Sequence, residues 1–168
     1  MSANTRSVAL SLCLGFTAFG CDSASDGAKP TSEATAESSK DEPFQVVRVE
    51  NSGDLPTILA THVAKAKAAG LQPYAELWAS WCPPCKAIEA SMGDPRMREA
   101  FTGAYVIQLD SDHWGPKLEG AGLSAASIPV FYALDSNGKP TGRKVDGGAW
   151  GDNTPENMAP PLKAFFQP

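Results

Sequence analysis

The segment Trp81-Cys82-Pro83-Pro84-Cys85-Lys86 is the most informative part of this chain for both its fold and its chemistry. Two thiols separated by two residues can close a disulfide within one turn of backbone, which makes the stretch a redox site. A helix N-terminus favours the reactive thiolate, because its free N–H groups and its dipole stabilise negative charge. Prolines are tolerated in a first helical turn, so Cys82 is predicted to begin a helix. Cys85 is then predicted to resolve mixed disulfides formed at Cys82.

The residues before the cysteines are predicted to form a buried strand. Residues 74–80 are mostly apolar or aromatic. Gly70 and Pro73 lie just upstream, and glycine and proline commonly bound buried strands. A strand that leads into a helix through Cys-x-x-Cys is the context in which this motif carries redox chemistry.

In this context the segment from Glu76 to Lys86, together with Ile128-Pro129, resembles the thioredoxin superfamily. Within that superfamily, the run from Trp78 to Phe101 is most similar to the C-terminal domain of bacterial transmembrane thiol-reductant carriers. The resemblance covers residues 44–166, roughly. It implies a thioredoxin-like α/β fold, in which a central mixed sheet is flanked by helices. It also implies a thiol–disulfide oxidoreductase activity for which no cofactor is expected.

The resemblance assigns roles to two further residues. Pro129 matches a cis-proline loop beside the disulfide, which leaves neighbouring backbone groups free to pair with an extended substrate. Glu76 matches a buried acid that takes the proton of the resolving thiol, since burial raises the pKa of a carboxyl group. The alternatives are a trans proline at a strand start and a Glu76 at a sheet edge in contact with a lysine. Gln108 stands where thioredoxins often pair that acid with a lysine.

Aromatic and proline side chains are expected to surround the cysteines. The residues predicted to contact substrate are Trp81, Pro83, Pro84 and Ile128. Trp78 is expected to pack inside the domain. Trp114 and Trp150 have no motif around them and are expected in the core or at its rim, so a docking role for them stays open.

The first residues predict export. Arg6 precedes the uncharged stretch from Val8 to Gly20, which is typical of a secretory signal peptide and too short to span a bilayer. Ala18-Phe19-Gly20-Cys21 resembles a lipoprotein cleavage site, which predicts removal of residues 1–20 and a lipid on Cys21. The alternative is ordinary cleavage, which leaves Cys21 as a free thiol or removes it. The mature protein is expected on the periplasmic side of a bacterial membrane.

Composition divides the remaining chain into two parts. Residues 22–42 contain no aromatic residue and no Leu, Ile or Val, so the segment 21–42 is predicted to be a disordered tether. Residues 43–168 are predicted to form one thioredoxin-like domain, which is large enough for a core without disulfide staples. Alternating patterns within it predict strands at 44–49, 74–80, 104–109, 130–134 and 143–146 and helices at 54–70, 82–92, 94–101, 116–121 and 160–166.

Charge and cysteine count exclude some function classes. The net charge of −5 argues against nucleic-acid binding, which requires a basic face. Of the four cysteines, Cys13 lies in the predicted signal peptide and Cys21 is the predicted lipid site. Cys82 and Cys85 remain as the redox pair, and no metal site is predicted, because structural zinc needs four ligands.

The predicted reaction is thiol–disulfide exchange on exported proteins, with Cys82 as the attacking thiolate. Pro83-Pro84 resembles the dipeptide of reducing thioredoxins, which favours a reductant that a membrane thiol-reductant carrier supplies with electrons. The clients would be exported protein thiols and disulfides, such as apocytochrome cysteines, and the protein is expected to be a monomer. The alternatives are a disulfide oxidase or isomerase, a chaperone that binds Cu(I) through the same cysteines, and a redox-inert binding module.

Overall fold

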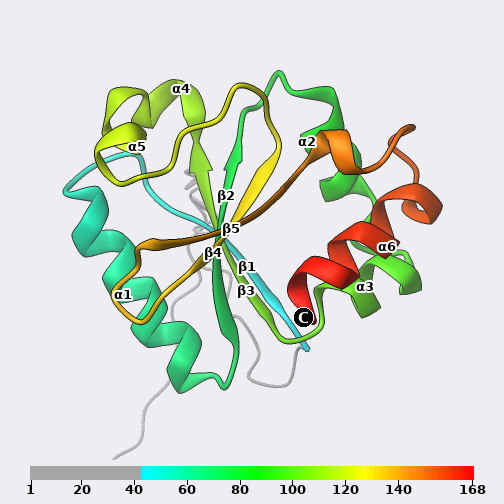
Figure 1. The fold of residues 1–168 in the computed structure, drawn as a ribbon, viewed down its shortest axis with the longest axis horizontal. Helices are drawn as coiled ribbons and strands as arrows, with labels where there is room; N and C mark the ends of the chain where they lie inside the picture. Colours follow the sequence, from blue (N-terminus) through cyan, green and yellow to red (C-terminus); the bar gives the residue numbers. More distant parts are fainter. Residues whose placement is uncertain (1–42) are drawn as a thin grey trace, which may run out of the picture. The chain divides into compact units, whose positions relative to one another are not determined.

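A computed structural model describes residues 43–168, and the predicted signal peptide, Cys21 lipid site and tether lie outside the described residues. Five strands form one sheet in the order β1-β3-β2-β4-β5 (Figure 1). The strands are β1 (Gln45–Arg48), β2 (Gln72–Trp78), β3 (Ala104–Asp110), β4 (Val130–Leu134) and β5 (Pro140–Asp146). β1, β3 and β2 run parallel, whereas β4 is antiparallel to β2 and β5. The predicted mixed sheet is therefore confirmed.

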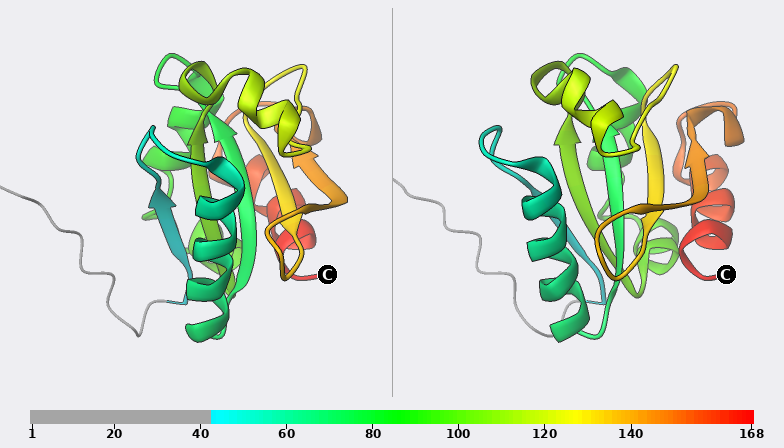
Figure 2. Two further views of the ribbon diagram at one scale, coloured as in Figure 1. Left: turned by 90° about the vertical axis from the view of Figure 1, so that its left-hand side faces the viewer. Right: turned by 60° about the vertical axis from the view of Figure 1, so that its left-hand side comes forward.

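Helices cover both faces of this sheet. They are α1 (Leu55–Ala68), α2 (Pro83–Ala90), α3 (Pro95–Phe101), α4 (Ser111–Trp114), α5 (Pro116–Gly120), the 3-10 turn η1 (Gly147–Ala149) and α6 (Pro155–Phe166). Helices α1 and α5 lie on one face, and α2, α3 and α6 lie on the other (Figures 1 and 2). Within residues 43–168, no helix has the length and apolar character needed to cross a membrane.

Capping residues begin the helices where the sequence predicts them. The Asp54 carboxylate accepts a hydrogen bond from the Thr57 backbone N–H at 3.1 Å at the start of α1. The Asp94 carboxylate accepts one from the Arg96 N–H at 2.9 Å at the start of α3. In both helices a proline occupies the first turn, where its missing N–H leaves no intrahelical hydrogen bond unmade.

The turn between β4 and β5 requires a glycine. Gly138 has a φ of +80°, and a Cβ placed there would lie 3.1 Å from the backbone N of Ala60 in α1. A side chain at this position would therefore be strained and would also push against α1. The strands predicted at 130–134 and 143–146 pair as an antiparallel hairpin, although β5 begins at Pro140, three residues before the predicted start at Arg143.

Two apolar clusters hold the helices against the sheet. The cluster on the α1 side includes Trp114, which is 1% exposed, and the cluster on the α6 side includes Trp150, which is 4% exposed. Both tryptophans therefore belong to the core. Full burial of one large side chain contributes about 1.5–3 kcal/mol, so each is a major part of its cluster.

The predicted start of the last helix at Pro160 is wrong. Helix α6 begins at Pro155, after the Thr154 hydroxyl, which caps the Asn157 N–H, and Pro160 and Pro161 lie inside it. Interior prolines normally end a helix, because each removes a hydrogen bond and its ring crowds the preceding turn. In α6 the buried side chains that hold the helix in place are Met158, Ala159, Leu162, Phe165 and Phe166. Packing outweighs the local signal.

Replacing the exposed Pro160 with alanine is expected to stabilise the domain by about 1–2 kcal/mol. Alanine restores a helical hydrogen bond and removes the ring clash, and the gain is partly offset by the greater freedom of the unfolded chain. Urea unfolding measures the change. Pro155→Ala is the matched control, because a proline at the first helical position leaves no hydrogen bond unmade, so no gain is expected there. Equal gains in both variants would contradict this account.

Candidate active site

The two cysteines form a disulfide at the start of α2. Cys82 is the N-cap residue of the helix, and its sulfur accepts a hydrogen bond from the Cys85 backbone N–H at 3.3 Å. Both side chains are largely buried, at 1% and 4% exposure. The helix N-terminus therefore directs the Cys85 N–H at the Cys82 sulfur, which would stabilise a thiolate once the disulfide is reduced.

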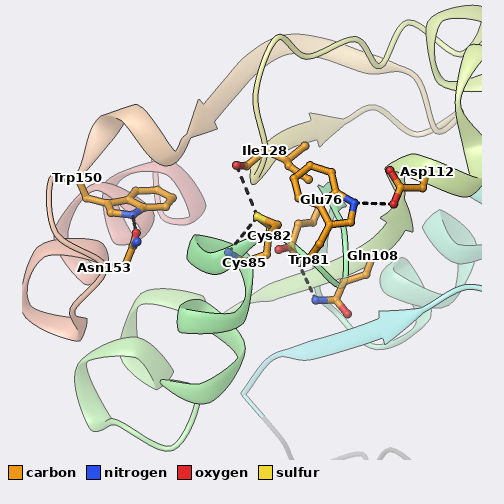
Figure 3. The surroundings of a disulfide bond; sticks show 9 residues. All are labelled: Glu76, Trp81, Cys82, Cys85, Gln108, Asp112, Ile128, Trp150 and Asn153. Carbon is orange, nitrogen blue, oxygen red and sulfur yellow. Dashed lines mark hydrogen bonds between the residues drawn. A yellow bond between two sulfur atoms is a disulfide. The ribbon is translucent and has the colours of Figure 1, made fainter.

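The Ile128-Pro129 loop lies against this disulfide. The peptide bond between the two residues is cis, as the resemblance implies. The Ile128 carbonyl oxygen lies 3.6 Å from the Cys82 sulfur (Figure 3). The Pro129 carbonyl accepts a hydrogen bond from the Gly147 N–H at 3.1 Å, which ties the loop to the end of β5. The Cys-x-x-Cys helix and the proline loop, far apart in sequence, thus form one site.

The two tryptophans beside the motif have different environments. The Trp81 side chain is 61% exposed, and its Nε1–H donates to the Asp112 carboxylate at 2.6 Å (Figure 3). Trp78 is only 7% exposed, and the Arg48 guanidinium lies 3.6 Å from the centre of its ring. The predicted packing of Trp78 inside the domain is confirmed, and Trp81 lies at the surface.

A groove of about 730 Å³ adjoins the site. Trp81 and Ile128 line it, together with apolar side chains from α5 and the following loop, including Leu118 and Leu123. Pro83 is exposed and Pro84 is half-buried at the start of α2. Of the four residues predicted to contact substrate, Trp81 and Ile128 line the groove.

Glu76 is buried on β2, so the alternative of an edge-facing glutamate is wrong. Its side chain is 2% exposed, and its Oε2 accepts a hydrogen bond from the Gln108 amide at 3.0 Å. Burial raises the pKa of Glu76 to about 7, opposed by the Gln108 hydrogen bond. The charge of Glu89 raises that pKa further, and the charge of Arg48 lowers it. Glu76 can therefore accept a proton near neutral pH.

Residues 43–168 contain no group of three His, Cys, Asp or Glu side chains placed to hold a metal ion. The cysteine pair is joined as a disulfide here, and thiolates must be free before they bind a soft metal.

Three residues beside the site were not identified from the sequence. Asp112 holds the Trp81 indole, while Arg48 and Glu89 form an ion pair of 2.6 Å near Glu76. A charged residue on a strand or a short helix carries no local signal for such contacts. Only the strand register that places Arg48 beside Gln108 could have indicated one of them.

Comparison with known proteins identifies the fold. A disulphide isomerase from Xylella fastidiosa Temecula1 is 20% identical with a TM-score of 0.50, over 70% of this chain and 92% of its own. Thioredoxin NaTrxh from Nicotiana alata is 24% identical with a TM-score of 0.42, over 64% of this chain and 85% of its own. No family model and no curated protein sequence matches the chain. The similarity to the first structure, together with the sheet and helix arrangement, confirms the predicted thioredoxin-like fold.

Proposed function

Because residues 43–168 have a thioredoxin-like fold with the Cys82–Cys85 pair at the start of α2, we propose that the protein is a thiol–disulfide oxidoreductase that reduces exported proteins. The observation that carries this function is the position of Cys82. Its sulfur caps a helix N-terminus and lies against the Ile128 carbonyl, beside the exposed Trp81 and the groove. A thiolate stabilised there is placed to attack a disulfide in an incoming chain.

The reaction starts from the reduced pair. The Cys82 thiolate attacks one sulfur of a client disulfide, so that a Cys82–client disulfide forms and the other client sulfur leaves as a thiolate. Cys85 then gives up its proton, for which the buried Glu76 carboxylate is the acceptor, and attacks the Cys82 sulfur. The client leaves with both sulfurs reduced, and two electrons have passed from the Cys82–Cys85 pair to the client.

The reducing direction and the location outside the cytoplasm rest on the sequence. The Pro83-Pro84 dipeptide has no histidine to stabilise the Cys82 thiolate strongly, which favours a reductant. The signal-like stretch from Val8 to Gly20 supports export, and Cys21 would anchor the protein to a membrane by a lipid. A membrane thiol carrier would restore the dithiol after each cycle.

The equilibrium reduction potential of the Cys82–Cys85 pair tests the direction. Titration against dithiothreitol and glutathione buffers is expected to give a value below about −250 mV, near that of a reducing thioredoxin. A value above about −180 mV would instead make the protein an oxidase or an isomerase. Tight Cu(I) binding without any exchange activity would favour the copper chaperone.

A further inference from the structure

Three polar side chains form a row across the sheet beneath α2. Arg48 of β1 pairs in register with Gln108 of β3, which in turn pairs in register with Glu76 of β2. Residues paired in this way on parallel strands point to the same face of the sheet. Figure 3 draws the Gln108 and Glu76 side chains of this row among the surroundings of the disulfide, with the hydrogen bond that joins them.

Hydrogen bonds join the row from end to end. The Gln108 Nε2–H donates to Glu76 Oε2 at 3.0 Å, and Gln108 Oε1 accepts from Arg48 Nη2 at 3.3 Å. A guanidinium only donates, so it requires the amide oxygen of Gln108 to face it. The amide nitrogen must then face Glu76. Arg48 therefore decides which way the Gln108 amide points, and the amide orients the buried carboxylate.

Arg48 is itself held in place by two contacts. Its Nη2 donates to Glu89 Oε1 of α2 at 2.6 Å, and its guanidinium stacks at 3.6 Å from the centre of the Trp78 ring. The Arg48 and Glu89 side chains are about half exposed, at 48% and 52%, whereas Glu76 is 2% exposed. The row thus connects a buried carboxylate to a charge pair at the surface.

The charges around Glu76 come from two elements and oppose each other. Arg48 of β1 lowers the pKa of Glu76, and Glu89 of α2 raises it. Helix α2 also carries Cys85 and has Cys82 as its N-cap, β3 contributes the neutral Gln108 amide, and β4 places Phe131 in register with Glu76. Removing one member of the Arg48–Glu89 pair would leave the other acting alone on the carboxylate.

We propose that Arg48 is a positioning residue that acts through Gln108: it fixes the orientation of the Glu76 carboxylate and balances the charge of Glu89 beside it. In the proposed reaction Glu76 receives the proton of Cys85, and the Arg48–Glu89 pair controls the orientation and the pKa of Glu76. The inference therefore rests on the proposed function. The contacts described for Arg48 are with Gln108, Glu89 and Trp78 and not with the cysteine sulfurs, and Glu76 remains the proton acceptor.

Two single variants of the full chain give opposite expectations. Arg48→Met leaves the Glu89 charge unbalanced and is expected to raise the pKa of Glu76 by about one unit. Glu89→Gln leaves the Arg48 charge unbalanced and is expected to lower it by a similar amount. In the double variant, the pKa of Glu76 is expected to return close to its value in the unmodified protein. The readout is the carboxyl ¹³C shift of Glu76 against pH, with the resonance identified by its loss in Glu76→Gln.

Arg48→Lys is the conservative control, because it keeps the positive charge but lacks the planar guanidinium. It is expected to keep most of the charge balance and to shift the Glu76 titration less than Arg48→Met. Shifts of the same sign in Arg48→Met and Glu89→Gln, or none in either, would overturn the proposal. The titration is read without any client, so a lack of exchange activity in the unmodified protein would defeat the proposed function without affecting this result.

The pH profile of the resolving step links the pair to catalysis. In rapid-mixing experiments, the rate at which a preformed Cys82–client disulfide is released is expected to shift along the pH axis with the Glu76 titration in each variant. If Arg48 had a purely structural role, replacing it would change the stability of the domain but would leave the midpoint of this pH profile unchanged. An unmoved midpoint, with a moved Glu76 titration, would overturn the role of the pair in proton transfer.

Discussion

Cys82→Ser is expected to lower the rate of disulfide reduction by about a thousand-fold or more. A serine hydroxyl does not ionise near neutral pH and forms no mixed disulfide, so the first step of the exchange is lost. Serine is also a preferred N-cap residue, so α2 should keep its start and the domain its fold. Reduction of insulin disulfides with dithiothreitol as the electron source measures the rate, and circular dichroism checks the fold.

Cys85→Ser is the matched control for this substitution. It keeps the attacking Cys82 sulfur but removes the thiol that releases the client, so a Cys82–client disulfide should accumulate. Non-reducing electrophoresis followed by mass spectrometry detects this adduct. A redox-inert binding module would instead show no insulin reduction even in the unmodified protein, and an adduct at Cys85 in Cys82→Ser would reverse the assigned roles.

Glu76→Gln is expected to raise the free energy of unfolding at pH 8 by about 3 kcal/mol, and to change it little at pH 4. The pKa of Glu76 rises from an ordinary 4.5 to about 7 on folding. The folded state therefore binds the proton more tightly than the unfolded state does. The stabilisation that comes from this bound proton is complete below about pH 4.5 and is lost as the pH rises through about 7. Glutamine is neutral throughout, so it avoids the cost of a buried charge.

Urea unfolding of both proteins at pH 4 and pH 8 measures this difference. Glu50→Gln provides the control, because Glu50 is exposed and its replacement is expected to have the same small effect at both pH values. If Glu76→Gln stabilised the protein equally at pH 4 and pH 8, its effect would come from packing and not from the loss of a buried charge.

Local signals account for the elements that were predicted well. Asp54 and Asp94 each cap a helix through a backbone N–H no more than three residues further along the chain. The turn at Asn137-Gly138 is closed by hydrogen bonds between residues no more than four positions apart. The Cys82 N-cap is equally local, because proline tolerance and helix capping depend only on adjacent positions. Contacts of this kind are encoded in short stretches and need no knowledge of the rest of the domain.

The start of α6 shows where local signals mislead. Pro160 and Pro161 indicate a helix start, yet Thr154 and Pro155 provide another one earlier in the chain. The choice between them depends on what the intervening turn can bury. Met158 and Ala159 pack into the cluster on the α6 side of the sheet, and this burial favours the longer helix.

Short stretches of sequence are enough to predict the Cys82–Cys85 pair at a strand–helix junction, the α/β class and Glu76 as an acid in a buried strand. The residues that surround them become known only from the folded domain. The contacts Arg48–Glu89, Gln108–Glu76 and Trp81–Asp112 join residues 41, 32 and 31 positions apart. Such contacts depend on strand order and register, which emerge when the whole core packs and which no short stretch of sequence specifies.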